Sequence, residues 1–141
     1  MKFVIGGAYQ GKLTYIQKMY GSGITADLLD GEQCKLQLPE KVSLFNHLHA
    51  YIRRMLLDGM KKEQELLDIR NQIYKDLQTV IQNNPDIIFI SDEIGYGIVP
   101  VEAFERLYRE ETGRICCKLA EQAERMTRVV CGIGTVIKEC R

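Results

Sequence analysis

Met1-Lys-Phe-Val-Ile-Gly-Gly-Ala-Tyr-Gln-Gly-Lys-Leu-Thr14 is the stretch that decides the predicted fold. Its apolar run Phe3-Val4-Ile5 is typical of a buried strand, and the run stops at Gly6-Gly7. Gly11-Lys12 then opens a segment with helical periodicity. These glycines and Lys12 match the phosphate-binding pattern G-x-x-x-x-G-K-[ST] except at its last position, where Leu13 stands. The opening therefore predicts a strand, a phosphate-binding loop and a helix.

The chemistry of that pattern assigns a role to most of its positions. Glycines let the backbone N–H groups approach phosphate oxygens, and the helix N-terminus adds partial positive charge. Lys12 would reach the outer phosphates, although it could also be an ordinary exposed lysine early in a helix. The predicted nucleotide-binding residues are Gly6, Gly7, Ala8, Tyr9, Gln10, Gly11, Lys12, Leu13 and Thr14.

Leu13 removes the hydroxyl that normally helps to hold Mg²⁺ in this pattern. Thr14 is a candidate replacement for that Mg²⁺ ligand. One step along a helix rotates the side chain by roughly 100°, so Thr14 is not equivalent to a hydroxyl at position 13. The sequence thus favours phosphate binding more strongly than phosphoryl transfer.

Length and composition predict one nucleotide-binding domain over residues 1–141. The balance of 19 Lys and Arg against 19 Asp and Glu gives no reason to expect a nucleic-acid partner. No apolar run approaches the roughly 20 residues that span a bilayer, and the N-terminus is unlike a secretory signal. Five cysteines without a C-x-x-C pair suggest structural thiols in a reduced compartment, which predicts a cytoplasmic location.

The rest of the chain alternates between strand and helix patterns. We expect strands at 24–29, 87–90, 128–132 and 135–138, and helices at 12–20, 42–57, 61–82 and 101–126. The last of these helices is expected to be bent or broken near Thr112-Gly113. The strand at 87–90 is apolar without alternation, as in parallel sheets that are covered on both faces. This order predicts an α/β fold with three layers, α/β/α, around a mostly parallel sheet.

Asp92 and Glu93 follow the strand at 87–90 and are candidates for metal binding. Ligands of open α/β sheets bind at the carboxyl ends of the strands, and carboxylates suit Mg²⁺. Glu93 could also act as a general base. The alternative is that the two residues cap a helix and carry solvated charges.

Two further groups are weaker candidates. His47 and His49 are two residues apart on a predicted helix, a spacing that is poor for one metal, and they could serve only packing. We keep His47 as a candidate catalytic residue, because group transfer can use a histidine nucleophile. Arg106 and Arg109 share a helix face and could clamp a substrate or a phosphate, although most arginines here could simply pair with neighbouring glutamates.

The second half of the chain resembles a known family. Ser91-Asp-Glu-Ile-Gly-Tyr-Gly-Ile-Val-Pro100, Arg106-x-x-Arg109 and Gly113-Arg114 are similar to the adenosylcobinamide kinase/adenosylcobinamide-phosphate guanylyltransferase signature N-E-V-G-x-G-I-V-P and R-x-x-R-D-x-x-G-R. The closing strands and the opening loop, G-G-x-x-S-G-K-S in the family, are similar as well.

The resemblance implies a phosphate-loop NTPase-like fold that binds ATP or GTP with Mg²⁺. It also implies phosphorylation of adenosylcobinamide in cobalamin biosynthesis, GMP transfer through a guanylylated histidine, a corrinoid partner and a homo-oligomer. Glu93 would sit at the family's active-site glutamate. The family's histidine follows its second strand, where this chain has Leu28-Leu-Asp-Gly-Glu-Gln-Cys34, so the resemblance transfers that role to neither His47 nor His49. The missing histidine and the leucine at position 13 together favour an alternative to an active enzyme. That alternative is a nucleotide-binding accessory or regulatory protein with impaired catalysis.

Overall fold

A six-stranded sheet with the order β2-β3-β4-β1-β5-β6 forms the centre of the computed structural model, which describes residues 1–140. All neighbouring strands run parallel except β5 and β6, which form an antiparallel hairpin. The strands are β1 (Lys2–Gly6), β2 (Leu28–Asp30), β3 (Leu44–Asn46), β4 (Ile88–Asp92), β5 (Arg125–Val130) and β6 (Ile133–Glu139). The helices are α1 (Lys12–Tyr20), the 3₁₀ turn η1 (Ser22–Thr25), α2 (Leu48–Lys61), α3 (Leu66–Asn83) and α4 (Ala103–Gln122).

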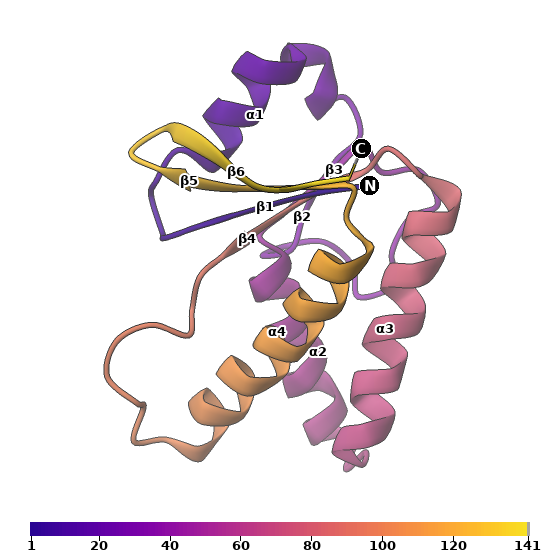
Figure 1. The fold of residues 1–141 in the computed structure, drawn as a ribbon. Helices are drawn as coiled ribbons and strands as arrows, with labels where there is room; N and C mark the ends of the chain where they lie inside the picture. Colours follow the sequence, from indigo (N-terminus) through magenta and orange to yellow (C-terminus); the bar gives the residue numbers. More distant parts are fainter. Residues whose placement is uncertain (141) are drawn as a thin grey trace.

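The helices cover both faces of the sheet. Helix α1 lies on one face, whereas α2, α3 and α4 lie together on the other (Figure 1). Side chains alternate along β1 accordingly: Phe3 packs into the cluster of α2–α4, and Val4 packs into the smaller cluster of α1. The expected three-layer α/β/α fold, like that of phosphate-loop NTPases, with a mostly parallel sheet is confirmed.

Several expected boundaries are wrong. Residues 24–29 form η1 and then the short β2 rather than one strand. The helix expected at 61–82 begins only at Leu66, and the one expected at 101–126 ends at Gln122, because β5 begins at Arg125. Helix α4 is also unbroken at Thr112-Gly113. Its Gly113 is exposed, and the bidentate ion pair of Arg70 with Glu111 holds this part of α4 against α3.

The largest correction concerns residues 42–57, expected as one helix. Leu44–Asn46 instead forms β3 between β2 and β4, and α2 begins only at Leu48. Leu44 and Phe45 are fully buried on opposite faces of the sheet. A short apolar run covered on both faces does not alternate, so its pattern cannot be told from that of a buried helix. This correction places His47 directly after a strand.

No helix within residues 1–140 has both the length and the apolar character that crossing a membrane requires.

Candidate functional site

The carboxyl ends of four parallel strands bring the polar residues of the site together. In the register of the sheet, Gly6 at the end of β1 lies beside Asp92 at the end of β4. Asp30 at the end of β2 likewise lies beside Asn46 at the end of β3. The residues that follow these strands therefore face one edge of the sheet, the edge at which α/β proteins bind ligands.

The glycine loop, residues Gly6–Lys12, connects β1 to α1 in a conformation that needs its glycines. Gly11 has a left-handed backbone with φ of 78°. A Cβ on Gly6 would lie 2.4 Å from the carbonyl oxygen of Val129, so this glycine allows β5 to approach β1. Gln10 ties the loop to the β5–β6 turn, because its side chain and its carbonyl accept hydrogen bonds from the N–H groups of Cys131 and Gly132.

Lys12 is buried at the base of this loop. Its ammonium donates to the carbonyl oxygen of Gly7 at 2.7 Å and lies 2.5 Å from a carboxylate oxygen of Asp92. The sequence predicts Lys12 from the strand–loop–helix pattern, and it predicts Asp92 independently from its position at the end of a strand. The structure brings them into direct contact across the neighbouring strands β1 and β4.

A cavity of about 310 Å³ opens over the glycine loop. Its walls are Ala8, Tyr9, Gln10, Gly11, Lys12, Leu13, Thr14, Glu32, Asn46, His47 and Asp92. Seven of the nine predicted nucleotide-binding residues thus line one cavity, and the carbonyls of the other two, Gly6 and Gly7, accept hydrogen bonds from Lys12. We call this space the loop cavity.

Leu13 and Thr14 differ in their surroundings although both line the loop cavity. Leu13 is half-buried and packs against the apolar cluster beneath α1. Thr14 is exposed. A leucine at this position therefore contributes to the packing of α1, where the usual motif would present a hydroxyl.

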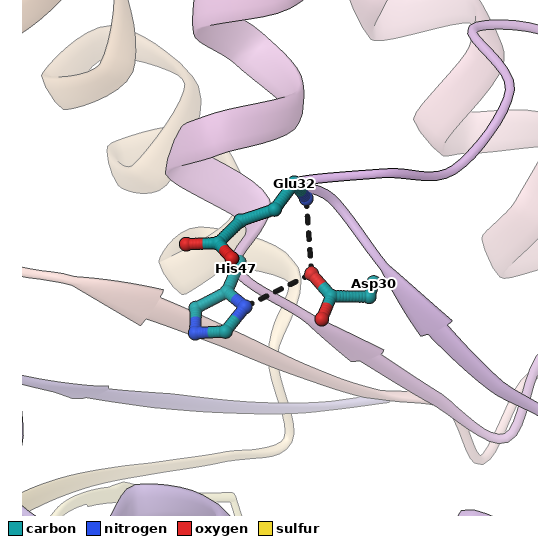
Figure 2. Close-up of side chains that lie close together, drawn as sticks. All are labelled: Asp30, Glu32 and His47. Atoms are coloured by element: carbon teal, nitrogen blue, oxygen red, sulfur yellow. Dashed lines mark hydrogen bonds and ion pairs between the residues drawn. The ribbon is translucent and has the colours of Figure 1, made fainter.

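His47 and Glu32 line the loop cavity, and Asp30 lies against both of them (Figure 2). The Nδ1 atom of His47 lies 2.9 Å from a carboxylate oxygen of Asp30, and the same oxygen accepts the backbone N–H of Glu32. Burial acts to raise the pKa of Asp30, but the hydrogen bonds from Glu32 and His47 lower it overall. An ionised Asp30 can only accept, so Nδ1 of His47 is the donor in this hydrogen bond, and Nε2 is the ring nitrogen that is not engaged by Asp30.

The same three side chains could also hold a metal ion. Asp30, Glu32 and His47 each offer a ligand atom, and these atoms lie within 4.8 Å of one another. His49 is not part of this cluster, which agrees with the poor spacing of the two histidines for one metal.

His49 turns to the opposite side, towards Asp92. Its Nδ1 accepts the backbone N–H of Asp92 at 3.1 Å, and its Nε2 lies 3.6 Å from the Asp92 carboxylate. Burial lowers the pKa of His49, and the charge of Asp92 opposes that shift only in part. His49 is therefore neutral, and the hydrogen bond that its Nδ1 accepts helps to hold Asp92 in place.

Glu93 and the two candidate arginines lie outside the loop cavity. Glu93 forms an ion pair with Arg128 at 2.9 Å, and with Arg109 it lines a second cavity on the α4 side of the sheet. Arg106 donates to the carbonyls of Pro100 and Val101 in the segment before α4. The structure thus brings Lys12, Asp92, Thr14 and His47 to one cavity, and separates Glu93, Arg106 and Arg109 from it.

Three residues of this site escaped prediction: Asp30, Glu32 and Asn46. Asp30 and Glu32 are not among the predicted site residues, and Asn46 falls inside the helix expected at 42–57. The available signal for Asp30 and Asn46 is that each closes a short apolar run, as Asp92 does at the end of β4, whereas Glu32 carries no such signal.

Comparison with known proteins identifies the family. A family model described as "Cobinamide kinase / cobinamide phosphate guanyltransferase" matches residues 22–137. The chain belongs to this family. The bifunctional adenosylcobalamin biosynthesis protein CobU of Escherichia coli K12 is 31% identical over 108 residues, which cover 71% of this chain and 60% of that protein. The protein of the same name from Salmonella typhimurium LT2 is 38% identical over 52 residues, which cover 37% of this chain and 29% of that protein.

The chain therefore spans less than two thirds of the length of these cobalamin biosynthesis relatives. The residues matched by the family model begin after α1 and include β2, β3, β4 and α4. They contain His47 and Asp92, whereas the glycine loop precedes them. The family match and the geometry of the glycine loop are therefore two independent observations about the loop cavity.

We expect Gly31→Ala to destabilise the protein by about 3 kcal/mol, because overpacking against backbone cannot be relieved by a rotamer change. A Cβ on Gly31 would lie 2.1 Å from the carbonyl oxygen of His47 and 3.0 Å from the backbone nitrogen of Tyr51. Urea unfolding measures the effect. Gly23→Ala is the control, because its Cβ would meet nothing within 4 Å, and equal stability of the two variants would contradict the packing argument.

Proposed function

We propose that the chain binds a purine nucleoside triphosphate, ATP or GTP, in the loop cavity and transfers a phosphoryl group to adenosylcobinamide. The observation that carries this proposal is the contact of Lys12 with Asp92 at the base of the glycine loop, within a strand–loop–helix unit. Membership of the cobinamide kinase family supports the choice of acceptor.

Lys12 would provide the positive charge for the outer phosphates. In the structure its ammonium is satisfied by two carbonyls and Asp92, and a bound phosphate would compete for it. The N-terminus of α1 opens on the same cavity and would add its backbone N–H groups. Positioning and charge stabilisation of this kind account for most of phosphoryl-transfer catalysis.

A Mg²⁺ ion fits the donor set of the cavity through Asp92, with Thr14 as a second oxygen on its wall. Bound with the nucleotide, Mg²⁺ would neutralise phosphate charge. Glu93 lies outside the loop cavity, where it forms an ion pair with Arg128. Asp92 is therefore the stronger metal candidate of the two.

His47 would carry the second activity, guanylyl transfer. In the proposed step its Nε2 attacks the α-phosphorus of GTP, an N–P bond forms, and the bond to pyrophosphate breaks. An oxygen of cobinamide phosphate then attacks the same phosphorus and releases Nε2. Asp30 holds the proton on Nδ1 and so keeps Nε2 available, as the carboxylate partner of a catalytic histidine does.

The second candidate function is nucleotide binding without catalysis, favoured by Leu13. The test is calorimetric titration with GTP and ATP, with and without Mg²⁺, followed by assay of adenosylcobinamide phosphorylation. Mg²⁺-dependent binding with turnover supports the kinase. Binding that is independent of Mg²⁺, without turnover, would overturn the kinase and favour the accessory protein.

We expect Leu13→Ser to increase the dependence of nucleotide affinity on Mg²⁺, because it restores the hydroxyl of the motif. The substitution should cost about 1 kcal/mol of stability, since a half-buried leucine leaves the cluster under α1. Leu13→Ala is the matched control, because it loses the same packing without gaining an oxygen. If the two variants respond to Mg²⁺ alike, position 13 has no part in metal binding.

A further inference from the structure

Three side chains with metal-binding atoms lie together where β2 and β3 end: Asp30, Glu32 and His47 (Figure 2). Asp30 is the last residue of β2, and His47 directly follows β3, its parallel neighbour. The Gly31 N–H donates to the carbonyl of Asn46 at 2.9 Å, which fixes the turn after β2 against the end of β3. The main chain of two paired strands therefore holds this cluster together.

The spacing and charge of the cluster suit a divalent cation. One ligand atom from each side chain lies within 4.8 Å of the other two, and Nδ1 of His47 is 2.9 Å from Asp30. Atoms bound to one ion at about 2.1 Å lie roughly 3 to 4 Å apart, so only small side-chain movements separate the cluster from a bound geometry. Within residues 1–140 no lysine or arginine forms an ion pair with either carboxylate, whereas Lys12 is paired with Asp92.

Asn46 adds a buried amide that lacks a full partner. The residue is 7% exposed, and it lines the loop cavity together with His47. Its amide nitrogen lies 3.3 Å from Nδ1 of His47, but that atom donates to Asp30 and so cannot accept. Turning the amide over would set its oxygen against the same Nδ1 proton, which Asp30 already takes at the shorter distance. A buried amide needs a partner, and a cation beside Nδ1 would provide one for its oxygen.

We propose that this three-residue cluster, completed by the amide oxygen of Asn46, binds a divalent transition-metal ion, Mn²⁺ or Zn²⁺. Three oxygens and one imidazole nitrogen suit such ions, whereas Mg²⁺ takes oxygen ligands and keeps much of its water. The site shares no ligand with the Mg²⁺ position proposed beside the nucleotide. It is therefore a second metal site at the loop cavity, and its existence does not depend on the proposed function.

The ion and guanylyl transfer would use the same imidazole, a consequence that does rest on the proposed function. The proposed nucleophile has no proton on Nε2. An ion on Nδ1 of His47 displaces the proton that is now donated to Asp30, and this proton moves through solvent to Nε2. Nε2 then has no free electron pair for attack on phosphorus. Occupation of the site would therefore stop guanylyl transfer.

The test is isothermal titration calorimetry of the whole chain with Mn²⁺ and with Mg²⁺, in the absence of nucleotide. Mn²⁺ is the probe because it favours oxygen and nitrogen over sulfur, which keeps the free cysteines out of the measurement. We expect one Mn²⁺ per chain, bound roughly tenfold or more tightly than Mg²⁺, because only the transition metal gains from the imidazole.

Glu32→Gln and His47→Gln should each weaken Mn²⁺ binding by roughly tenfold or more, because each removes one ligand. The matched controls are Glu121→Gln, at an exposed position of α4, and His49→Gln, whose ring bonds to Asp92. Both controls should bind Mn²⁺ as the parent protein does. Equal affinity for Mn²⁺ and Mg²⁺, or Mn²⁺ binding that neither Glu32→Gln nor His47→Gln weakens, would overturn the site.

Covalent labelling by GTP separates this site from the proposed guanylyl transfer. At an Mn²⁺ concentration that saturates only the parent protein, its labelling should be roughly tenfold or more slower than with Mg²⁺, and Glu32→Gln should show no such difference. Equally fast labelling of the parent with both ions would overturn ligation through Nδ1. Mn²⁺ binding that both variants weaken, without labelling under either ion, would leave the site standing and overturn guanylyl transfer by His47.

Discussion

Lys12→Ala is expected to weaken GTP and ATP binding by about 100-fold. The ammonium would make charge-assisted hydrogen bonds to phosphate oxygens, and losing them costs about 3 kcal/mol. The loss is increased because the substitution leaves Asp92, now 2.5 Å from the ammonium, as an uncompensated negative charge beside the phosphates. Isothermal titration calorimetry of each nucleotide measures the change directly.

Lys18→Ala is the matched control for this experiment. Lys18 lies on the same helix, α1, but is exposed in its last turn, and its removal changes the net charge by the same amount. We expect its nucleotide affinity to remain within about twofold of the parent protein. Circular dichroism of Lys12→Ala would check that the variant folds. Unchanged binding in a folded Lys12→Ala protein would rule out the glycine loop as the phosphate site.

His47→Gln is expected to abolish covalent labelling by GTP that carries its radiolabel on the α-phosphate. A glutamine cannot form the N–P bond, so the label on the protein should fall at least 100-fold while GTP affinity is largely retained. Label on the parent protein should be acid-labile and stable to base, as a phosphoramidate is. Acid lability together with loss in His47→Gln assigns the nucleophile.

Two further variants test the arrangement around that histidine. Asp30→Asn retains the nucleophile but no longer fixes the proton on Nδ1, so we expect labelling to be roughly 10- to 100-fold slower. His49→Gln should still be labelled, because the His49 ring bonds to Asp92 rather than to Asp30. Labelling that persists in His47→Gln and disappears in His49→Gln would contradict the assignment.

Local patterns in the sequence were sufficient for the strand–loop–helix opening. Few other secondary structures are compatible with an unbroken apolar run that is followed by a pair of glycines and then by an apolar residue at every third or fourth position. The helix expected at 12–20 agrees with α1, Lys12–Tyr20, and the strand expected at 87–90 agrees closely with β4. Asp92 could be placed at the ligand-binding edge for the same reason, since it follows a strand that could be recognised.

The middle of the chain could not be assigned in this way. Leu44–Asn46 is only three residues long, too short for its pattern to differ from one turn of a buried helix. Placing these residues in a helix put His47 on a helix face, away from the strand ends. The partnership of His47 with Asp30, seventeen residues earlier, depends on the parallel pairing of β2 with β3.

The sequence by itself determined the fold class, the glycine loop and the positions of Lys12 and Asp92, because each is encoded in a short stretch. Only the tertiary structure decided which side chains share a cavity. Asp92 and Glu93 are neighbours in sequence, yet one meets Lys12 and the other Arg128, because successive residues of a strand point to opposite faces. The pairing of β1 with β4 likewise brings Asp92 to a loop eighty residues away, and no local pattern records such a contact.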